Sequence, residues 1–449
     1  MKDNGWINLD KKLRKEIESF GDEYISFLNE VKTEREACSF IVSNLIKNGY
    51  EEIGKIKKLK YGDKVFYVNK NKSVYAAVIG KNDIEKGLNI IGSHIDSPRL
   101  DLKPNPIIED NEQVMLKTQY YGGIKKYQWT SIPLCMRGVV IKENGEKINI
   151  NIGEKKEDPI FTITDLLPHL AKEQSEKKLS EAIEGESLNI LIGNSKVSTD
   201  DTFKSAITTI LSEKYNITEE DLTSAEIEFV PAFEAKSLGF DSSMVAGYGQ
   251  DDKACAYTSL QALLKIENPD TTAVAIFADK EEIGSMGNTG MMSNTFDSFI
   301  IDLLLKKEKD PYLINHVYRN SKMLSADVDG AFDANYPNAF DKNNASRLGH
   351  GVCINKYTGG RGKSSASDAN SEYLSYIKKV FKDKVKYQFS VLGKIDLGGG
   401  GTIAYILANK GVDVVDCGVP VLSMHSPYEV TSKFDIYTAY NAYYEFYNN

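Results

Sequence analysis

Short apolar runs rich in β-branched residues recur along this chain, and each ends just before a histidine or a carboxylate. The clearest runs are 88–91, 272–278, 323–326 and 419–423. They precede, in the same order, His94, the pair Glu281 and Glu282, Asp327, and His425. Runs this short and apolar are typical of strands buried in a sheet. Because open α/β sheets bind ligands beyond the carboxyl ends of their strands, we expect these side chains at the same end of one sheet.

Helical patterns separate the apolar runs. Residues 9–49, 251–266 and 435–447 show apolar residues at helical spacing or read as helix after a loop. Strands that alternate with helices form sheets covered on both faces. The sequence therefore predicts an α/β fold with a mixed, mostly parallel sheet flanked by helices.

The segment 98–234 has a different texture from the rest of the chain. It begins with short strand-like pieces broken by turn residues and continues with a charged, more helical part from 165 to 213. The candidate ligands lie on both sides of it. We therefore expect one domain formed by residues 1–97 plus 235–449, with a β-rich domain inserted at 98–234.

Composition limits the classes of partner. The 449 residues carry a net charge of −9, which argues against nucleic acid or an anionic membrane as a main partner. No run of about 18 apolar residues is present, so we expect no membrane span, and the start of the chain does not resemble a signal peptide. The 5 cysteines are far apart and form no C-x-x-C pair, which favours a reducing cytoplasm over a cysteine zinc site.

The candidate ligands together match the needs of two metal ions. Two histidines and three carboxylates suffice for a pair of zinc-like ions if one carboxylate bridges them. The five candidates are His94, Asp251, Glu282, Asp327 and His425. Glu281 is a spare carboxylate beside a ligand, where a general base is useful. The spacing alone leaves Asp329 as an alternative to Asp327.

Two acidic neighbours have other possible roles. Asp96 lies two residues after His94, so that its carboxylate can orient the imidazole. Asp252 follows Asp251 at the start of a predicted helix, and we expect it to satisfy the helix N-terminus. The remaining histidine of interest is His169, in the inserted segment, which is either a buried structural residue or a site residue.

In these segments the chain resembles the M18 family of metalloaminopeptidases, which includes aspartyl aminopeptidase and yeast vacuolar aminopeptidase I. The resemblance runs over nearly the whole chain in order. It rests on Gly-Ser-His-Ile-Asp-Ser-Pro at 92–98, Leu-Pro-His-Leu-Ala at 167–171, Gln-Asp-Asp at 250–252, Glu-Glu-Ile-Gly-Ser at 281–285, Ser-Ala-Asp at 325–327 and Met-His-Ser at 424–426. The fold it implies is that of the zinc exopeptidases.

The resemblance implies a role for each matching residue. One ion would be held by His94, Asp251 and Asp327, and the other by Asp251, Glu282 and His425. Glu281 would be the general base on a water shared by both ions, and Asp96 the catalytic partner of His94. His169 would contact substrate or metal. The cofactor would be two divalent ions, zinc in the first place, with manganese and cobalt also suited to N and O ligands.

The resemblance also implies substrates and assembly. The substrates would be peptides with a free N-terminus, and the inserted domain would serve dimerisation and help to close a neighbour's active site, with dimers forming a tetrahedral dodecamer. The chain departs from many relatives after Asp327, where Asp329 and Gly330 replace a histidine, and around Lys356, where the lysine of aspartyl aminopeptidases is offset or absent. Acidic and neutral N-terminal residues therefore both remain possible substrates.

Two alternatives to an aminopeptidase stay open from the sequence. One is a hydrolase of the same clan, an N-acyl amino-acid deacylase or a carboxypeptidase, which would ignore a free α-amine. The other is a non-catalytic, self-assembling shell protein that keeps a fossil site. The complete ligand set and Glu281 argue against the second alternative.

Overall fold

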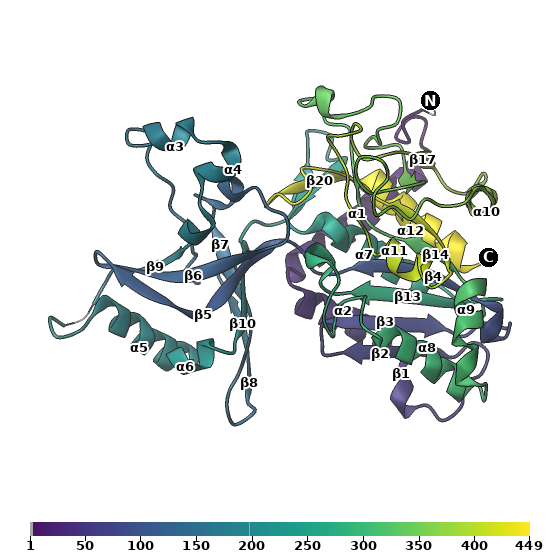
Figure 1. The fold of residues 1–449 in the computed structure, drawn as a ribbon, viewed down its shortest axis with the longest axis horizontal. Helices are drawn as coiled ribbons and strands as arrows, with labels where there is room; N and C mark the ends of the chain where they lie inside the picture. The colour runs from purple at the N-terminus through teal and green to yellow at the C-terminus, as the bar shows by residue number, and fades with distance from the viewer. Residues whose placement is uncertain (1–2, 197) are drawn as a thin grey trace. The chain divides into compact units, whose positions relative to one another are not determined.

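The computed structural model describes residues 3–196 and 198–449, which form two compact units (Figure 1). The first unit comprises Met1–Ser97, Ala235–Met424 and Tyr428–Asn449. The second comprises Pro98–Glu234 together with His425–Pro427. Every helix among the described residues is too short or too polar to span a bilayer.

A nine-stranded sheet forms the centre of the first unit, in the order β1-β2-β3-β13-β4-β14-β18-β16-β17. Its strands are β1 (Glu51–Glu52), β2 (Lys64–Asn69), β3 (Ser73–Val78), β4 (Leu88–His94), β13 (Thr272–Ala278), β14 (Lys322–Ser325), β16 (Val352–Asn355), β17 (Tyr387–Phe389) and β18 (Asp413–Gly418). Five of the eight neighbouring pairs are parallel and three are antiparallel. The predicted mixed, mostly parallel sheet is confirmed.

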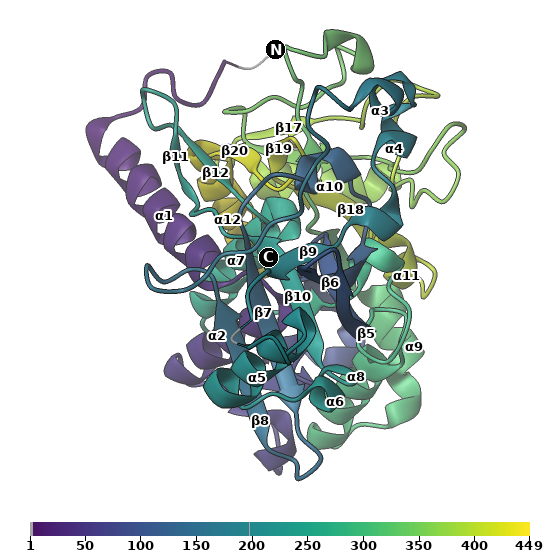
Figure 2. The ribbon, with the colours of Figure 1, turned by 90° about the vertical axis from the view of Figure 1, so that its left-hand side faces the viewer.

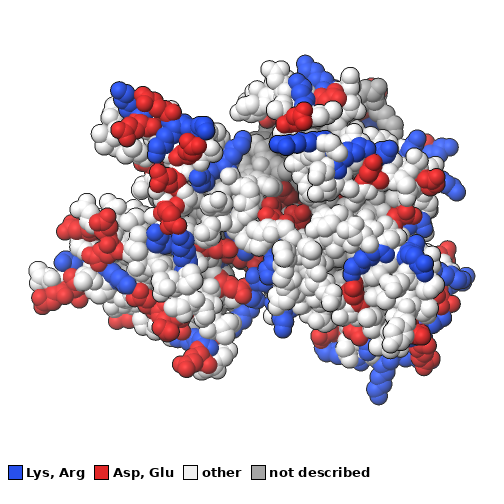
Figure 3. Space-filling model, in the orientation of Figure 1, with Lys and Arg blue, Asp and Glu red and all other residues white. Residues whose placement is uncertain are grey.

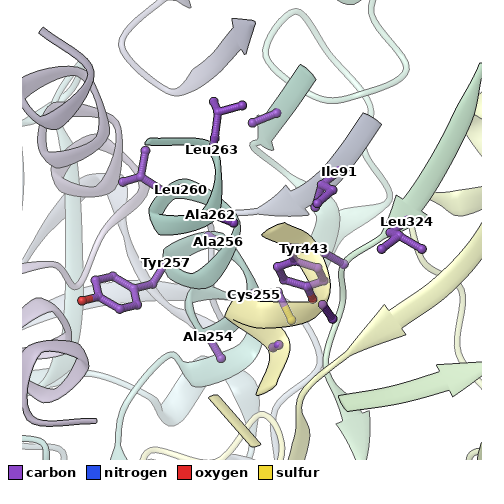
Figure 4. Close-up of a cluster of buried hydrophobic side chains, with 14 of the residues drawn as sticks. Ile91, Ala254, Cys255, Ala256, Tyr257, Leu260, Ala262, Leu263, Leu324 and Tyr443 are labelled. Atoms are coloured by element: carbon purple, nitrogen blue, oxygen red, sulfur yellow. The ribbon is translucent and has the colours of Figure 1, made fainter. Parts of the chain in front are cut away.

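Helices cover both faces of this sheet. Along β13, Ala273 and Phe277 face one apolar cluster while Val274 and Ile276 face the other, which explains why the strand is apolar throughout. The first cluster takes side chains from α1 (Lys11–Glu30), α2 (Glu34–Lys47), α7 (Gln250–Leu264), α10 (Ser371–Phe381) and α12 (Lys433–Tyr447). The second takes them from α8 (Thr295–Lys306), α9 (Ile314–Asn320) and α11 (Ala404–Ala408). Figure 4 shows Tyr257 and Tyr443 from α7 and α12 within the first cluster.

The helical stretch predicted over 9–49 is two helices rather than one. α1 ends at Glu30, and α2 begins after Thr33. Thr33 and Glu36 form a capping box, in which the backbone N–H of Glu36 donates to Thr33 Oγ1 and that of Thr33 to Glu36 Oε2 at 3.1 Å. This arrangement satisfies free N–H groups at the start of a new helix, so that the chain turns between the two helices.

A small five-stranded sheet corrects one prediction. Its order is β11-β12-β20-β19-β15, from β11 (Lys236–Leu238), β12 (Met244–Gly247), β20 (Glu429–Ser432), β19 (Pro420–Leu422) and β15 (Asp329–Gly330). The apolar run before His425 is β19, so the expectation that it belongs to the same sheet as the other runs is wrong. β18 pairs with β14 in the main sheet instead, and the chain then leaves that sheet so that β19 pairs antiparallel with β20.

The second unit is built on a six-stranded antiparallel sheet, in the order β8-β7-β10-β5-β6-β9. Its strands are β5 (Arg99–Asp110), β6 (Gln113–Tyr121), β7 (Leu134–Ile141), β8 (Lys147–Ile152), β9 (Ile190–Gly193) and β10 (Glu226–Pro231). α5 (Phe203–Tyr215) and α6 (Glu219–Leu222) lie against this sheet, as Figure 2 shows. Among the described residues between β8 and β9 lie two short α-helices, α3 (Lys172–Glu176) and α4 (Leu179–Ala182), and a 3-10 turn at Gly185–Ser187.

Exposed charged side chains of both signs lie on each of the two units. On the face drawn in Figure 3, acidic and basic side chains are interspersed. Several form exposed ion pairs, such as Lys58 with Glu308 at 2.5 Å and Lys204 with Glu219 at 2.6 Å. Exposed pairs of this kind contribute little to stability.

Candidate metal centre

Three of the predicted segments meet at the carboxyl ends of adjacent parallel strands. β13, β4 and β14 are neighbours in that order, and Ala278 pairs with His94 at the end of β4. The 3-10 turn Glu281–Ile283 follows β13, and Asp327 follows β14. Because the three strands run in one direction, their carboxyl ends bring these segments to the same edge of the sheet.

Close backbone approach fixes the segment that carries Asp327. A Cβ added to Gly418, at the end of β18, would lie 1.7 Å from the carbonyl oxygen of Asp327. Only glycine permits the two backbones to pass this closely. Gly418 therefore sets the position of Asp327 from the neighbouring strand.

The fourth segment lies at the start of α7. Asp251 and Asp252 have non-helical backbone angles there. The backbone N–H of Asp251 donates to Glu429 Oε2 at 3.1 Å, and Asp252 Oδ2 accepts from the backbone N–H of His94 at 3.2 Å. In its own helix the Asp252 side chain contacts the Cys255 thiol, not the backbone N–H groups of the first turn, so the prediction that it caps α7 is wrong. The hydrogen bond from His94 instead joins the strand of one candidate ligand to the helix of another.

Carboxylates surround one nitrogen of the His94 ring, and the ring is only 1% exposed. Nε2 lies 3.2 Å from Asp251 Oδ1, 3.8 Å from Glu281 Oε2 and 3.9 Å from Asp327 Oδ1. On the other side, Nδ1 lies 3.0 Å from the carbonyl oxygen of Asp96 and 3.3 Å from its Oδ1. Asp96 thus occupies Nδ1 and leaves Nε2 directed at the carboxylates, as in histidines that bind metals.

Asp96 also contacts the turn after β13. Its carboxylate is fully buried and accepts from the backbone N–H of Glu281 at 3.1 Å and from that of Glu282 at 3.2 Å. One side chain therefore orients both the imidazole of His94 and the backbone of the tandem glutamates. The side chain of Glu281 keeps 16% of its surface exposed, so that a small molecule can reach it.

The carboxylates at this edge carry excess negative charge. Burial raises the pKa of Asp327 well above its ordinary value, and Asp252, Glu281 and Asp251 raise it further. Burial alone would lower the pKa of His94, but hydrogen bonds to Asp251 and Asp96 raise it well above its ordinary value. Neighbouring carboxylates thus contribute to both shifts, although burial is the largest cause at Asp327.

Three side chains of the first unit offer the geometry of a metal site. One ligand atom each from His94, Asp251 and Asp327 lie within 4.8 Å of one another. Glu282, in the turn after β13, and His425 are the remaining predicted ligands. In its own unit, His425 Nδ1 lies 2.8 Å from the carbonyl oxygen of Gly123, which leaves Nε2 for a ligand.

The other two candidates are Asp329 and His169. Asp329 is 3% exposed and accepts from Asn355 Nδ2 at 3.0 Å and from Ser390 Oγ at 2.7 Å. Both of these hydrogen-bond donors are neutral, whereas Asp327 faces His94. His169 is exposed in the second unit, so its interpretation as a buried structural histidine is wrong.

Several polar residues around Asp251 were not predicted. Lys253 is fully buried and donates from Nζ to Ser97 Oγ at 2.6 Å, and Ser97 Oγ donates to the carbonyl oxygen of Asp251 at 2.7 Å. Glu429, 1% exposed, binds the N–H of the same residue. Lys253 could have been predicted from the sequence, because a lysine at the start of a largely apolar helix is unusual enough to suggest a buried polar role. Glu429 could not have been predicted, because it is brought to Asp251 by the pairing of β20 with β12, which no local sequence pattern encodes.

Comparisons with known proteins agree on one family. The family model described as aminopeptidase I zinc metalloprotease (M18) matches residues 27–447. A probable M18 family aminopeptidase 1 of Clostridium acetobutylicum is 49% identical over 455 residues, which cover 99% of this chain and 98% of that protein.

Solved structures share the fold. The crystal structure of an M18-family aminopeptidase from Thermotoga maritima is 43% identical, has a TM-score of 0.96, and is matched over 100% of this chain and 99% of that one. A more distant likeness in fold is the S. cerevisiae mApe1 dodecamer, 20% identical with a TM-score of 0.76 over 96% of this chain and 97% of that one.

Proposed function

Because the chain belongs to the M18 family of zinc metalloproteases and is an aminopeptidase, we propose that it releases N-terminal residues from peptides at a centre of two divalent ions. The observation that carries the proposal is the cluster of His94, Asp251 and Asp327, one ligand atom of each within 4.8 Å of the others, with Glu281 beside it. A carboxylate has two oxygens, so one side chain can serve two neighbouring ions.

The residues present fit such ions. Buried carboxylates that raise one another's pKa need a cation nearby, and Asp327 among Asp252, Glu281 and Asp251 meets this description. Nitrogen and oxygen ligands suit zinc, and also manganese and cobalt. We propose that His94, Asp251 and Asp327 hold one ion and that Asp251, Glu282 and His425 hold the other.

Within this centre we propose that Glu281 is the general base. When bound, the ions would supply Lewis acidity that lowers the pKa of water and polarises a carbonyl oxygen. Glu281 Oε2 lies 3.8 Å from His94 Nε2, beside the first set of candidate ligands, and its backbone N–H is held by Asp96. From there Glu281 takes a proton from the attacking water and later donates it to the leaving amine.

The second unit supports a proposal about assembly. We propose that copies of the chain associate through it and that His169, exposed on it, contacts substrate at a neighbour's site. Several apolar side chains around His169 are also exposed, including Leu167 at 49% and Leu170 at 67%. The dodecamer of the yeast relative is a precedent. Twelve chains of 50.1 kDa would weigh about 600 kDa, which light scattering after size exclusion would detect.

The cytoplasm is the compartment that we propose for the protein. All five cysteines are buried and free, which suits a reducing environment. Alkylation of the denatured protein, isolated from cells under acid quench, should label all five. Protection of any pair would contradict this proposal.

Initial rates on aminoacyl substrates test the proposed activity. The panel holds N-terminal Asp, Glu, Leu, Met and Lys with an N-acetylated control, and the dialysed enzyme receives zinc, manganese or cobalt. We expect metal-dependent release from free-amine substrates only, and the Asp-to-Leu rate ratio measures the preference between acidic and neutral residues. Turnover of the acetylated control alone would favour a deacylase, and no turnover with any metal would favour a non-catalytic assembly.

A further inference from the structure

The tip of the β2–β3 hairpin contacts the loop that carries Glu281 and Glu282. The tip is the turn between Asn69 and Ser73, which pair across the hairpin. Asn69 is 4% exposed, and its Nδ2 donates to the carbonyl oxygen of Asn288 at 2.8 Å. Asn288 lies on the returning arm of the loop, so this bond ties the loop to a rigid element of the main sheet.

Internal hydrogen bonds close the same loop on itself. Thr289 Oγ1 donates to Asp279 Oδ2 at 2.5 Å, and Asp279 forms an isolated parallel bridge with Gly290. Ser285 N–H donates to the carbonyl oxygen of Lys280 at 2.7 Å. A displacement at Asn288 or at Asp279 would therefore be transmitted to the turn between them, where the tandem glutamates lie.

Three buried acids lie near enough to interact electrostatically, and one of them pairs with the hairpin tip. Glu34 is fully buried and pairs with Lys72 of the tip, Nζ to Oε1, at 2.8 Å. Asp279 is 1% exposed and Asp96 is fully buried. Burial, Glu34 and Asp96 raise the pKa of Asp279 to about 6, whereas the hydrogen bond from Thr289 and the charge of Lys72 lower it. Lys72 thus supplies positive charge to a group of acids that ends at Asp96, the acceptor of both glutamate N–H groups.

We propose that Asn69 and Lys72 are positioning residues for the reaction, because they hold the Glu281–Glu282 turn through Asn288 and through the acids Glu34 and Asp279. Neither side chain needs to touch the substrate. This inference rests on the proposed role of Glu281 as the base. It adds that the β2–β3 hairpin, which does not itself carry a site residue, stabilises the position of the loop that carries Glu281.

Substitution at Lys72 gives the main test, with the full-length, zinc-loaded enzyme and the substrate of the panel that wild type cleaves fastest. Because small displacements of a catalytic group reduce rate strongly, we expect Lys72→Met to lower kcat by about 10-fold while KM changes by less than about 2-fold. Metal content, measured by mass spectrometry of the dialysed protein, should stay at the wild-type value. Lys72→Arg, which keeps the charge, should recover most of the rate.

A second variant keeps every charge in place. Removal of the cation beside the buried Glu34 also affects folding, so Asn69→Ala provides an independent measurement of the hairpin contact. We expect it to lower kcat by about 3-fold with unchanged metal content and KM. In crystals of either variant, the carboxylate of Glu281 should be displaced relative to His94.

The matched control is Lys309→Met. Lys309 Nζ pairs with Glu85 Oε1 at 2.8 Å, and Glu85 precedes β4, at the opposite end of that strand from His94. This variant should keep the wild-type kcat.

Two results would overturn the proposal. One is a kcat within about 2-fold of wild type in both Lys72→Met and Asn69→Ala. The other is a fall in melting temperature with no change in kcat of the folded enzyme, which would indicate a purely structural role. Failure of the base assignment is distinguishable, since it would appear as wild-type turnover in Glu281→Gln.

Discussion

The first unit buries carboxylates in two regions, which differ in the groups that face them. At the start of α12, Asp435 accepts from the backbone N–H of Gly349 at 2.6 Å and from that of Gly351 at 2.7 Å. At the ends of β4 and β14, Asp251 and Asp327 instead face His94 and other acids. Asp435, a buried acid with a structural role, is hydrogen-bonded by neutral backbone donors. Acids that face one another remain short of positive charge, which is the property of a cation site.

Loss of the proposed bridging ligand should have the largest effect. Asp251→Asn removes a charge from both of the proposed ligand sets. We expect metal content to fall towards zero and kcat/KM to fall by about 10³-fold or more, because each lost ion supplies several kcal/mol of transition-state stabilisation. Asp383→Asn, the same change at an exposed site, should match wild type. Full metal occupancy in Asp251→Asn would exclude its role as the bridge.

Substitutions of Glu281 and Glu282 should distinguish a loss of proton transfer from a loss of metal binding. Glu281→Gln should lower kcat by about 10²–10⁴-fold and keep the metal, since only proton transfer is lost. Glu282→Gln should lower metal content as well as rate. Metal analysis and steady-state rates on the same preparations check both. Near-wild-type turnover in Glu281→Gln would remove it as the general base.

The structural acid should show the opposite pattern. In Asp435→Asn, the amide group would face one of two backbone N–H donors, so we expect the free energy of unfolding to fall by about 1–3 kcal/mol. The rate per folded molecule should not change, and urea denaturation with activity measured in parallel checks both. A loss of metal in this variant would contradict the assignment of Asp435 to a structural role separate from the metal site.

The smallest predicted effect is a pH dependence of stability. Burial raises the pKa of Asp435 from 3.8 to about 8, although hydrogen bonds from Gly349 and Gly351 oppose the shift. Between these values the native state holds a proton that the unfolded chain has released, so this group makes stability fall as pH rises. The free energy of unfolding of wild type should therefore fall relative to that of Asp435→Asn from pH 5 to pH 8. A relative rise over this range would contradict the raised pKa.

The sequence predicted the strands whose apolar runs are buried on both faces, but not every partner. β4, β13 and β14 lie in the main sheet, as expected. β19 does not, because the short apolar run 419–423 has no feature that selects one sheet over another. β18, interrupted by Asp413 and Asp416, was not predicted. The apolar pattern of a strand predicts that it is buried, but which strands it pairs with depends on the tertiary structure.

The candidate site shows the same limit. Residues just after apolar strands could be proposed as ligands, because the topology of open sheets fixes where such residues lie. The contacts of Asp96 with the N–H groups of Glu281 and Glu282 join positions 185 and 186 residues apart, and no local pattern encodes them. Asp252 was misassigned for this reason, since its partner is on β4.

Anomalous diffraction from crystals of the zinc-loaded protein, collected on both sides of the zinc edge, tests the proposed two-ion centre most directly. We expect two peaks, one bound by His94, Asp251 and Asp327 and the other by Asp251, Glu282 and His425. Both peaks should disappear in Asp251→Asn crystals soaked in the same way. A single peak in the wild type, or two peaks that do not share Asp251, would contradict the account.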